Sequence, residues 1–600
     1  MRHQVIFLPG HIKTEAERGT TVMDACRNAG IHIDAPCGGN GTCGKCLVGI
    51  TGEDGKTSVR LACKTRIFGD MTVDVSAREH EHRILLDGTG GVHELAPAVR
   101  NAVIDVRKPS VDDGNSEWER LVEAISGKLS IPADSVSPNP FLAAMLYRTL
   151  KDNDYRIEAL VCGTEIIAIF KPGESCYAIA FDIGTTTIVG YLLDLRTGGQ
   201  SAVSSMLNPQ SAYGADVVMR SKHAIENGIS QLSQAVRQAL NTIIRNTAGK
   251  CGIDPTQIYL VTAVGNTCMH HLFLGISPES LVFAPYTPAI REALLLDARD
   301  YGLSVNDRAK LMVLPNIAGF TGADTTGALL ASEIDKSDSL TLLIDIGTNG
   351  EIVLGNRHRM IACSTAAGPA FEGALIACGM RGADGAIDHF NINGARAEYT
   401  VIGGGRPAGI CGSGLIDAVA GLLENGIVDR SGRIADPEKL LQSDGVPEYA
   451  KPDIAARIRS IEGIRSFIIA EENETDTGKP IYISQKDIRE VQLAKAAIAA
   501  GIKLLAEEFG VGTADIEKVL IAGAFGNYMS PKSACLISMI PPELEDRIIP
   551  IGNAAGEGAK RAALSINEFE RSKRIAKTCK YIELAAHPGF QDRFIEELEF

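Results

Sequence analysis

The chain lacks an excess of basic residues: its 59 Lys and Arg stand against 74 Asp and Glu, which gives a formal net charge of −15. Without a stripe of basic side chains, so acidic a chain is not expected to bind nucleic acid as its main partner. It also lacks an apolar run long enough to span a bilayer, and the run near its start is too short for a signal peptide. We therefore expect a cytoplasmic protein that does not associate with membranes.

The length of the chain bounds its organisation. Six hundred residues are too many for one hydrophobic core, so several domains are expected, and a content of 45% hydrophobic and 22% charged residues is typical of globular proteins. Fourteen cysteines in a cytoplasmic chain are expected to be reduced, which disfavours a disulfide framework. Ten of them are scattered singly, Cys26 among them, and are predicted to be small buried side chains.

The remaining four cysteines form a cluster in the sequence. Three lie in the glycine-rich stretch PCGGNGTCGKC, and the overall spacing is C-x5-C-x2-C-x16-C. A zinc ribbon usually has two C-x2-C pairs, and only one is present, whereas the glycines would let amide N–H groups turn toward sulfur acceptors. The pattern resembles the 2Fe–2S ferredoxins, nearer the adrenodoxin-like branch than the plant type, with zinc as the alternative. The ligands implied by this resemblance are Cys37, Cys43, Cys46 and Cys63.

Two stretches of the remaining chain match each other. YAIAFDIGTTTIVGYLLDL (177–195) and LTLLIDIGTNGEIVLGNRH (340–358) each have an apolar strand, then Asp-Ile-Gly-Thr, a turn and a second apolar strand. A glycine in each turn, Gly184 or Gly347, lets the hairpin close with backbone N–H groups and threonine hydroxyls facing a phosphate. Asp182 and Asp345, at the strand ends, could hold Mg²⁺ through water. The two copies predict a duplicated phosphate-binding architecture.

A third element supports a nucleotide site. KVLIAGAFGNYM (518–529) runs from a strand into small residues, where Gly523 and Gly526 would let the backbone lie against an adenine or ribose. The three elements together resemble the acetate kinase, sugar kinase, heat-shock chaperone and actin superfamily, which implies two similar α/β halves around an ATP·Mg²⁺ cleft. The ATP-site residues implied are Asp182, Asp345, Gly184, Thr185, Thr186, Gly347, Thr348, Asn349, Gly523 and Gly526. The base that positions the attacking water stays open among Glu351, which we rank first, Asp324 and Glu372.

The order of these units is specific. With NPQSAYGADV (208–217), PNIAGFTGAD (315–324), QKDIREVQLAKAA (485–497) and IPIGNAAGEGA (549–559), the whole chain resembles the reductive activators of corrinoid proteins. That resemblance implies ATP-dependent transfer of one electron from a single 2Fe–2S cluster to a cobalt(II) corrinoid on a partner of a methyltransferase system. It also implies an upstream low-potential electron donor and a possible homodimer. The chain has no D-x-H-x-x-G corrinoid signature, so the cobalt cofactor is expected on the partner.

Two other functions remain open at this level: a small-molecule kinase with a redox-sensing ferredoxin domain, and an electron carrier whose ATPase half is a degenerate scaffold. The expected fold is multidomain, with an α+β ferredoxin-like (β-grasp) domain, a small α+β middle domain and a duplicated α/β actin-like ATPase domain. The expected bounds are 1–78 for the ferredoxin-like domain, 79–97 for a linker, 98–172 for the middle domain, and 173–600 for the ATPase, divided near 173–336 and 337–600.

Overall fold

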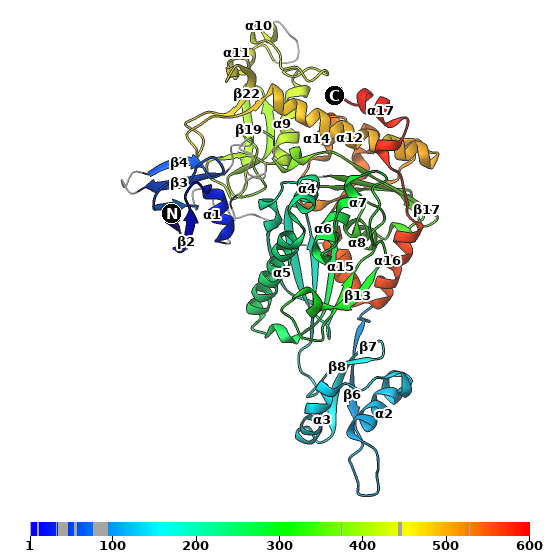
Figure 1. The fold of residues 1–600 in the computed structure, drawn as a ribbon. Coiled ribbons are helices and arrows are strands. Elements are labelled where there is room, and N and C mark those ends of the chain that lie inside the picture. The colour runs from blue at the N-terminus through cyan, green and yellow to red at the C-terminus, as the bar shows by residue number, and fades with distance from the viewer. Residues whose placement is uncertain are drawn as a thin grey trace.

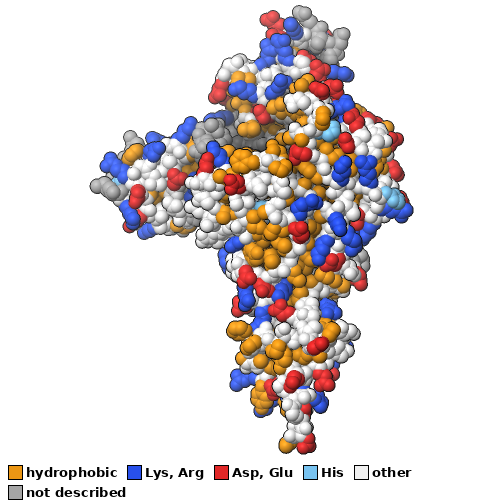
Figure 2. All heavy atoms as spheres, turned by 45° about the vertical axis from the view of Figure 1, so that its right-hand side comes forward, with side chains coloured by type: hydrophobic (Ala, Val, Ile, Leu, Met, Phe, Trp, Pro, Cys, Tyr) orange, Lys and Arg blue, Asp and Glu red, His pale blue; other side chains and the backbone are white. Residues whose placement is uncertain are grey.

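A computed structural model of the chain describes residues 2–8, 11–29, 31, 33, 46–52, 57–75, 94–347, 349–373, 375–441, 447–526 and 528–600. Among the helices in these ranges, none is both long enough and apolar enough to cross a membrane. On the face drawn in Figure 2, Lys and Arg side chains are interspersed with Asp and Glu.

The N-terminal part is a five-stranded mixed sheet with one helix. The strand order is β2-β1-β5-β3-β4, in which β1 and β5 run parallel and the other pairs antiparallel. Helix α1 begins after Thr21, whose side chain accepts a hydrogen bond from the Asp24 amide, and packs Met23 and Cys26 against Val5 and Phe7. This is the predicted β-grasp arrangement. Its elements are β1 (Arg2–Leu8), β2 (Ile12–Glu17), α1 (Val22–Asn28), β3 (Leu47–Gly52), β4 (Thr57–Leu61) and β5 (Met71–Asp74).

A small α+β unit follows and protrudes from the larger body (Figures 1 and 2). Its antiparallel sheet has the order β6-β7-β8, and two helices cover one face. Ser116 and Glu119 form a reciprocal capping box at the start of α2, and Asn139 caps α3. The elements are β6 (Val99–Asp105), α2 (Glu117–Leu129), α3 (Pro140–Asp152), β7 (Arg156–Cys162) and β8 (Glu165–Phe170).

The first half of the large part is built on a six-stranded sheet of order β11-β10-β9-β12-β14-β13. Strands β9, β10 and β11 form an antiparallel meander, and β12 and β14 join it parallel to β9. The elements are β9 (Tyr177–Ile183), β10 (Thr187–Asp194), β11 (Gln200–Leu207), α4 (Val217–Asn227), α5 (Ser230–Cys251), β12 (Ile258–Gly265), α6 (Thr267–Leu274), α7 (Glu279–Val282), β13 (Leu294–Asp297), β14 (Lys310–Val313) and α8 (Ala323–Ser332).

The second half repeats this topology. Its sheet has the order β25-β24-β15-β16-β17-β26, again with an antiparallel meander (β15-β16-β17) and two strands, β24 and β25, parallel to the first. The match of the two sheets confirms the duplication predicted from the repeated hairpins. The main-sheet strands are β15 (Thr341–Ile346), β16 (Gly350–Asn356), β17 (Arg359–Thr365), β24 (Lys518–Ala522), β25 (Ile548–Gly552) and β26 (Lys580–Tyr581).

Further elements of this half surround the second sheet and form two small three-stranded sheets, β19-β18-β20 and β21-β22-β23. The strands are β18 (Ala386–Asn393), β19 (Arg396–Val401), β20 (Gly409–Ile410), β21 (Ile458–Ile461), β22 (Ile464–Ala470) and β23 (Ile481–Ser484). The helices are α9 (Gly412–Glu424), α10 (Pro437–Leu440), α11 (Lys451–Ala456), α12 (Gln485–Phe509), α13 (Gly523–Gly526), α14 (Pro531–Leu536), α15 (Ala554–Leu564), α16 (Ile566–Thr578) and α17 (Phe590–Glu596).

The alternation of side chains along the strands explains how the two halves pack. In β9, Ile179 and Phe181 face the core made with α5, whereas Ala178 and Ala180 face a second core. Leu343 of β15 faces that same second core, which also contains buried residues of α8, α15 and α16, while its neighbours face α12. The central helices therefore lie between the two sheets, with α5 and α12 on the outer faces.

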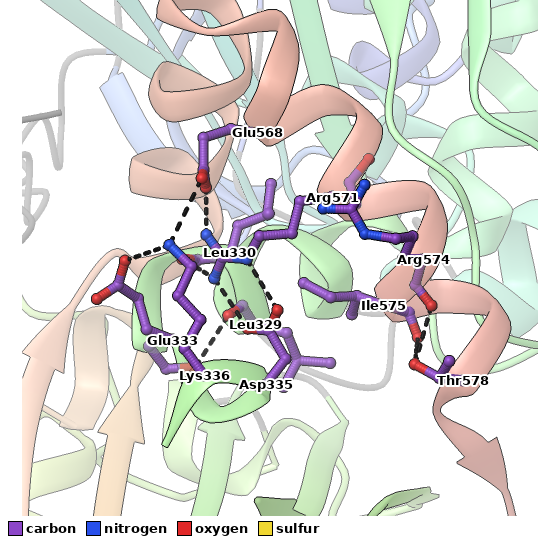
Figure 3. A network of polar contacts seen from close by, with 12 residues as sticks. Leu329, Leu330, Glu333, Asp335, Lys336, Glu568, Arg571, Arg574, Ile575 and Thr578 are labelled. Carbon is purple, nitrogen blue, oxygen red and sulfur yellow. Dashed lines mark hydrogen bonds and ion pairs between the residues drawn. The ribbon is translucent and has the colours of Figure 1, made fainter. Parts of the chain in front are cut away.

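A network of ion pairs joins the central helices (Figure 3). The buried guanidinium of Arg571, on α16, bonds both carboxylate oxygens of Asp335 at 2.8 and 2.9 Å and donates to the Leu330 carbonyl at the end of α8. Glu568 bonds Arg571 and lies 3.6 Å from Lys336. Because a buried ion pair with matched geometry is strongly destabilised when one partner is lost, this network fixes α16 on α8.

Candidate functional site

A cavity of about 520 Å³ opens where the two sheets meet. The two Asp-Ile-Gly-Thr turns approach each other there, together with the start of α8, the end of β24 and the start of α15. Each turn follows the first strand of its half, so the duplication places both at one opening. The residues of the sequence analysis that line it are Asp182, Gly184, Thr185, Thr186, Asp324, Asp345, Gly347, Asn349, Glu351, Glu372 and Gly523. Thr348 lies outside the described residues.

The first turn is held tightly. The Gly184 amide donates to the Thr187 carbonyl at 3.0 Å, and a Cβ at Gly184 would come 2.6 Å from that oxygen, so only glycine fits. Asn266 donates to the Thr185 hydroxyl at 2.9 Å, and the Thr186 hydroxyl donates to Glu372 of the second half at 2.9 Å. The last contact bridges the two halves directly across the cavity.

The second turn closes in the same way but is less crowded. The Gly347 amide donates to the Asn349 carbonyl at 2.9 Å. A Cβ at Gly347 would meet nothing nearer than that carbonyl at 3.8 Å. A side chain at position 184 would therefore clash with the turn itself. A side chain at position 347 would not clash, and the glycine there leaves space beside the cavity.

Six acidic side chains line this cavity, and four of them are Asp182, Asp345, Glu351 and Asp324. Asp182 ends β9, Asp345 pairs with Glu351 across the β15–β16 hairpin, and Asp324 lies in the first turn of α8. Burial raises the pKa of Asp182 and of Asp345 to about 7 and that of Asp324 to about 6, and repulsion between these carboxyls adds to the shift of Asp182 and Asp345. The pKa of Glu351 is raised well above its usual range, first by burial and then by Asp324 and Asp345.

The charge balance of the cavity favours a cation. Asn553, the N-cap of α15, donates to Asp182 at 2.9 Å, and Ser364 donates to Glu351 at 3.4 Å, but both partners are neutral. Arg381 is the one basic side chain among the described residues that line the cavity. In the described part of the chain, no three acidic, His or Cys side chains converge closely enough to hold a metal ion directly. The acidic groups therefore fit a hydrated divalent cation, which would reach them through water.

The third predicted motif contributes one glycine to the cavity. Gly523 follows β24 and begins α13 with a φ of +90°, and a Cβ there would come 2.9 Å from an Asp345 carboxylate oxygen. Gly526 does not line the cavity. Its backbone packs on β24, where a Cβ would lie 2.3 Å from a methyl carbon of Ile521. Close packing of α13 on the strand thus accounts for Gly526.

Two of the four clustered cysteines are described. Cys46, just before β3, and Cys63, just after β4, bring their sulfur atoms to 3.3 Å although they are seventeen positions apart. Cys37 and Cys43 lie outside the described residues. Cys26 is buried on α1 and burial raises the pKa of its thiol to about 12, so it is a neutral core residue. The converging pair fits a shared iron–sulfur group, since thiolates are the ligands of such clusters.

Comparison with known proteins identifies the family. The chain is 34% identical over 602 residues to "Corrinoid activation enzyme RamQ" of Eubacterium limosum, which covers 100% of this chain and 99% of that protein. The chain belongs to the RACo family of corrinoid activators. It is also 24% identical to "[Co(II) methylated amine-specific corrinoid protein] reductase" of Methanosarcina barkeri, over 71% of this chain and 77% of that protein.

A solved structure and four family models agree with this assignment. The structure entitled "Reductive activator for corrinoid,iron-sulfur protein" is 31% identical, covers 100% of this chain and 98% of its own, and superimposes with a TM-score of 0.76. The matching models are the 2Fe-2S iron-sulfur cluster binding domain (6–67), the RACo linker region (91–175), the RACo middle region (177–337) and the C-terminal domain of RACo, the ASKHA domain (339–600). The RACo chain thus combines a 2Fe–2S domain with an actin-like ASKHA domain.

Sequence reasoning did not single out three residues that line this RACo cavity: Asn266, Arg381 and Asn553. Asn266 and Asn553 both cap helices that begin beside the cavity, α6 and α15, and Asn553 stands in the stretch IPIGNAAGEGA that the sequence analysis quoted. An Asn between a strand and a helix pattern is a recognisable N-cap signal. Arg381 carries no such local signal.

Proposed function

We propose that this RACo chain is an ATP-dependent reductive activator. It passes one electron to a cobalt(II) corrinoid on a partner protein of a methyltransferase system and so produces cobalt(I). The supporting relatives are named for corrinoid activation and for reduction of a Co(II) corrinoid protein. The observation that carries the proposal is the full-length match, because it covers a 2Fe–2S domain and an ASKHA domain in one chain.

The geometry and the family support a set of proposed residue roles. Cys37, Cys43, Cys46 and Cys63 are the proposed ligands of a single 2Fe–2S cluster, which supplies a one-electron carrier when bound. The convergence of the Cys46 and Cys63 sulfur atoms at 3.3 Å supports this set. The chain's absence of a D-x-H-x-x-G motif supports a corrinoid held by the partner. An upstream low-potential donor reloads the cluster, and a homodimer is the proposed assembly.

The cavity is the proposed ATP·Mg²⁺ site. Asp182 and Asp345 hold the hydrated Mg²⁺, supported by their burial without a basic partner within the described part of the chain. The proposed phosphate contacts are Gly184, Thr185, Thr186, Gly347, Thr348 and Asn349. Gly523 borders the adenosine, and Gly526 shapes α13 behind it.

Glu351 is the proposed base for the attacking water. Burial and the neighbouring carboxyls raise the pKa of Glu351, which makes its carboxylate a stronger proton acceptor, and it lies beside Asp345 in the hairpin register. Asp324 and Glu372 also face the cavity. Glu372 accepts a hydrogen bond from Thr186 at 2.9 Å and Asp324 one from the Thr325 amide at 2.7 Å, whereas Glu351 accepts a longer bond from Ser364 at 3.4 Å, which favours Glu351 for this role.

ATP is needed because the electron transfer is uphill. Cobalt(I) is a very strong reductant, and every ~60 mV of unfavourable one-electron gap costs about 1.4 kcal/mol. A nucleotide can help only by binding two states of the protein with different affinity. The Thr186–Glu372 bond across the cavity supports such a role, since a phosphate at Thr186 would compete with Glu372 for the hydroxyl proton and change how the halves meet.

Anaerobic titration of a candidate Co(II) corrinoid protein tests the proposal. The chain, with its cluster reduced, is mixed with the corrinoid protein with and without Mg·ATP, and the visible spectrum of the corrinoid is followed. We expect Co(I) to form only, or at least tenfold faster, with ATP. An equal rate without nucleotide would make the ATPase half a scaffold, and ATP turnover that yields a phosphorylated metabolite would make the chain a kinase. Either result overturns the proposal.

A further inference from the structure

Three successive carbonyl groups of the first turn, those of residues 184–186, are bound by one segment, residues 208–220. The Asn208 side chain donates to the Gly184 carbonyl at 2.8 Å, its amide donates to the Thr186 carbonyl at 2.8 Å, and Arg220 donates to the Thr185 carbonyl at 2.6 Å. In a planar trans peptide the N–H points opposite to the C=O. The amides of Thr185 and Thr186 therefore point away from this segment.

These two amides are available to a ligand. Within the described chain, no acceptor is bonded to the amide of Thr185 or Thr186, and both residues line the cavity. Two free amides side by side at a turn form an anion-binding concavity. The segment 208–220 thus favours anion binding, because its hydrogen bonds hold the carbonyl oxygens on the side away from the cavity.

Arg220 adds an unbalanced charge behind this turn. Its side chain is fully buried and donates to the carbonyls of Gly214 and Thr185, at 2.9 and 2.6 Å, and to the sulfur of Met269, at 3.3 Å. None of these partners carries a negative charge. Burial lowers the pKa of Arg220 to about 10, so the guanidinium stays charged at neutral pH.

Comparison with the other buried arginines shows that this is unusual for the molecule. Arg120, Arg561 and Arg571 are equally inaccessible, and each has a carboxylate within 4 Å. Among the described residues, Arg220 bonds two carbonyls and a sulfur atom and forms no ion pair with a carboxylate. Asp216 and Glu372 attract it only at longer range, and Arg381 opposes them. Burial of a cation without a counter-ion costs free energy of folding. An anion bound at the adjacent turn would balance the charge of Arg220 and offset that cost.

We propose that Arg220 is a positioning residue for the phosphate chain of the nucleotide. Through the Thr185 carbonyl it orients the amides of Thr185 and Thr186, and its charge strengthens binding in proportion to the number of phosphates. This inference rests on the proposed function for the identity of the ligand. It assigns a role to the segment NPQSAYGADV, in which Gly214 is required because a Cβ would lie 2.7 Å from the Arg220 amide nitrogen.

The test compares adenosine, Mg·ADP and Mg·ATP as ligands in calorimetric titrations of the full chain. In Arg220→Met we expect ATP to bind about tenfold more weakly or worse, ADP to lose less, and adenosine to change less than about twofold. Arg220→Lys keeps the charge, so the ratio of its affinity for ATP to its affinity for adenosine should stay close to that of the wild type. Arg237→Met is the matched control: this half-buried arginine on α5 donates to the Phe273 carbonyl, and its loss should leave the ratio unchanged.

Two results overturn the inference: equal weakening of adenosine and ATP, which would give Arg220 a purely structural role, or no change in either. If the methionine variant does not fold, Arg220→Gln replaces it, because a glutamine amide can still donate to the Thr185 carbonyl without a charge. Failure of the wild-type chain to bind any adenine nucleotide would instead contradict the proposed function. Nucleotide binding by the wild type with an unchanged ratio in the variants contradicts only the role of Arg220.

Discussion

At the scale of single residues, the buried carboxyl groups that are proposed to bind the hydrated cation lower the stability of the ligand-free fold when they ionise. Asp345 is buried beside Asp182 and Asp324, and its pKa is about 7 in the folded chain compared with about 4 for an unfolded Asp. Because the folded state holds this proton more tightly, ionisation of Asp345 destabilises the ligand-free fold as pH rises from about 4 to 7. The cost is fully developed above pH 7.

Asp345→Asn removes that cost, since the amide cannot ionise. We expect the ligand-free variant to be more stable than the wild type, and the advantage to grow by about 2–3 kcal/mol between pH 5 and pH 8. Mg·ATP affinity should fall at least tenfold, because the carboxylate that attracts the hydrated cation is lost. Urea unfolding at the two pH values and calorimetric titration measure the two effects.

Asp338→Asn is the control for this change. Asp338 is exposed and paired with Arg357, so its loss should leave both the pH dependence and the Mg·ATP affinity unchanged. A stability advantage of Asp345→Asn that is the same at pH 5 and pH 8 would contradict the burial-induced pKa shift.

The sequence predicted these residues unevenly. Asp182 and Asp345 were found because each ends an apolar strand at a repeated turn, a purely local pattern. Asn553 donates to Asp182 although the two residues are 371 positions apart in the sequence, and a local sequence pattern cannot predict such a long-range contact. The sequence analysis assigned Gly526 to the nucleotide site. A glycine after a strand can let the backbone approach a ligand, or it can let a helix pack closely on the strand. The close contact with Ile521, which only the structure shows, accounts for Gly526 by helix packing.

At the scale of elements, the contact of α8 with α15 positions the cavity. A Cβ at Gly558 of α15 would lie 2.0 Å from the Gly327 carbonyl of α8, so the two helix backbones touch. The first turn of α8 carries Asp324, and the N-cap of α15 is Asn553, the partner of Asp182. A change in the separation of these helices therefore moves two groups of the cavity at once.

Gly558→Ala should push the helices apart. We expect a loss of about 1–3 kcal/mol in unfolding free energy from the overpacked contact, with weaker Mg·ATP binding as Asp324 and Asn553 move. The same substitution at Gly249 of α5, where a Cβ meets nothing within 4 Å, should stabilise the chain by about 0.5–1 kcal/mol through helix propensity. Equal effects of the two variants would show that the helices do not constrain each other.

Elements with strong local signals were predicted, and those without them were not. The two hairpins were predicted from their apolar strands and repeated turns, and the structure confirms them. Helices α2 and α12 show the same kind of local signal, because each has apolar periodicity behind a capping serine, Ser116 or Ser484. Strands β2 and β4 were missed because their residues are mostly exposed and charged or polar. Their pairing with β1 and β3 comes from the tertiary sheet.

At the scale of the whole molecule, helix α15 extends from the cavity to Ala96, which lies between the N-terminal 2Fe–2S domain and the rest of the chain. The Ala96 amide donates to the Leu564 carbonyl at the end of α15, and the Ile566 amide donates to the Ala96 carbonyl. Asn553 at the other end of this eleven-residue helix contacts Asp182. Because a helix is stiff over about 16 Å, a displacement at the cavity is carried to the point where the chain leaves toward the 2Fe–2S domain. The proposed cluster ligands Cys46 and Cys63 adjoin the N-terminal sheet, whereas the cavity lies between the other two large sheets, so each site should be removable without loss of the other.

Cys63→Ser and Asp345→Asn, prepared side by side, test this division of labour. Serine replaces one proposed cluster ligand, so Cys63→Ser should lose the cluster's visible absorbance and corrinoid reduction while its Mg·ATP affinity stays within about twofold of the wild type. Asp345→Asn should keep the cluster spectrum and its reducibility by dithionite, yet form Co(I) no faster with ATP than without. Loss of ATP binding in the cysteine variant would show that the two parts fold as one unit. Undiminished Co(I) formation in that variant would mean that the electron reaches cobalt without passing through Cys63, and the proposed path from thiolate-bound iron to the partner would have to be abandoned.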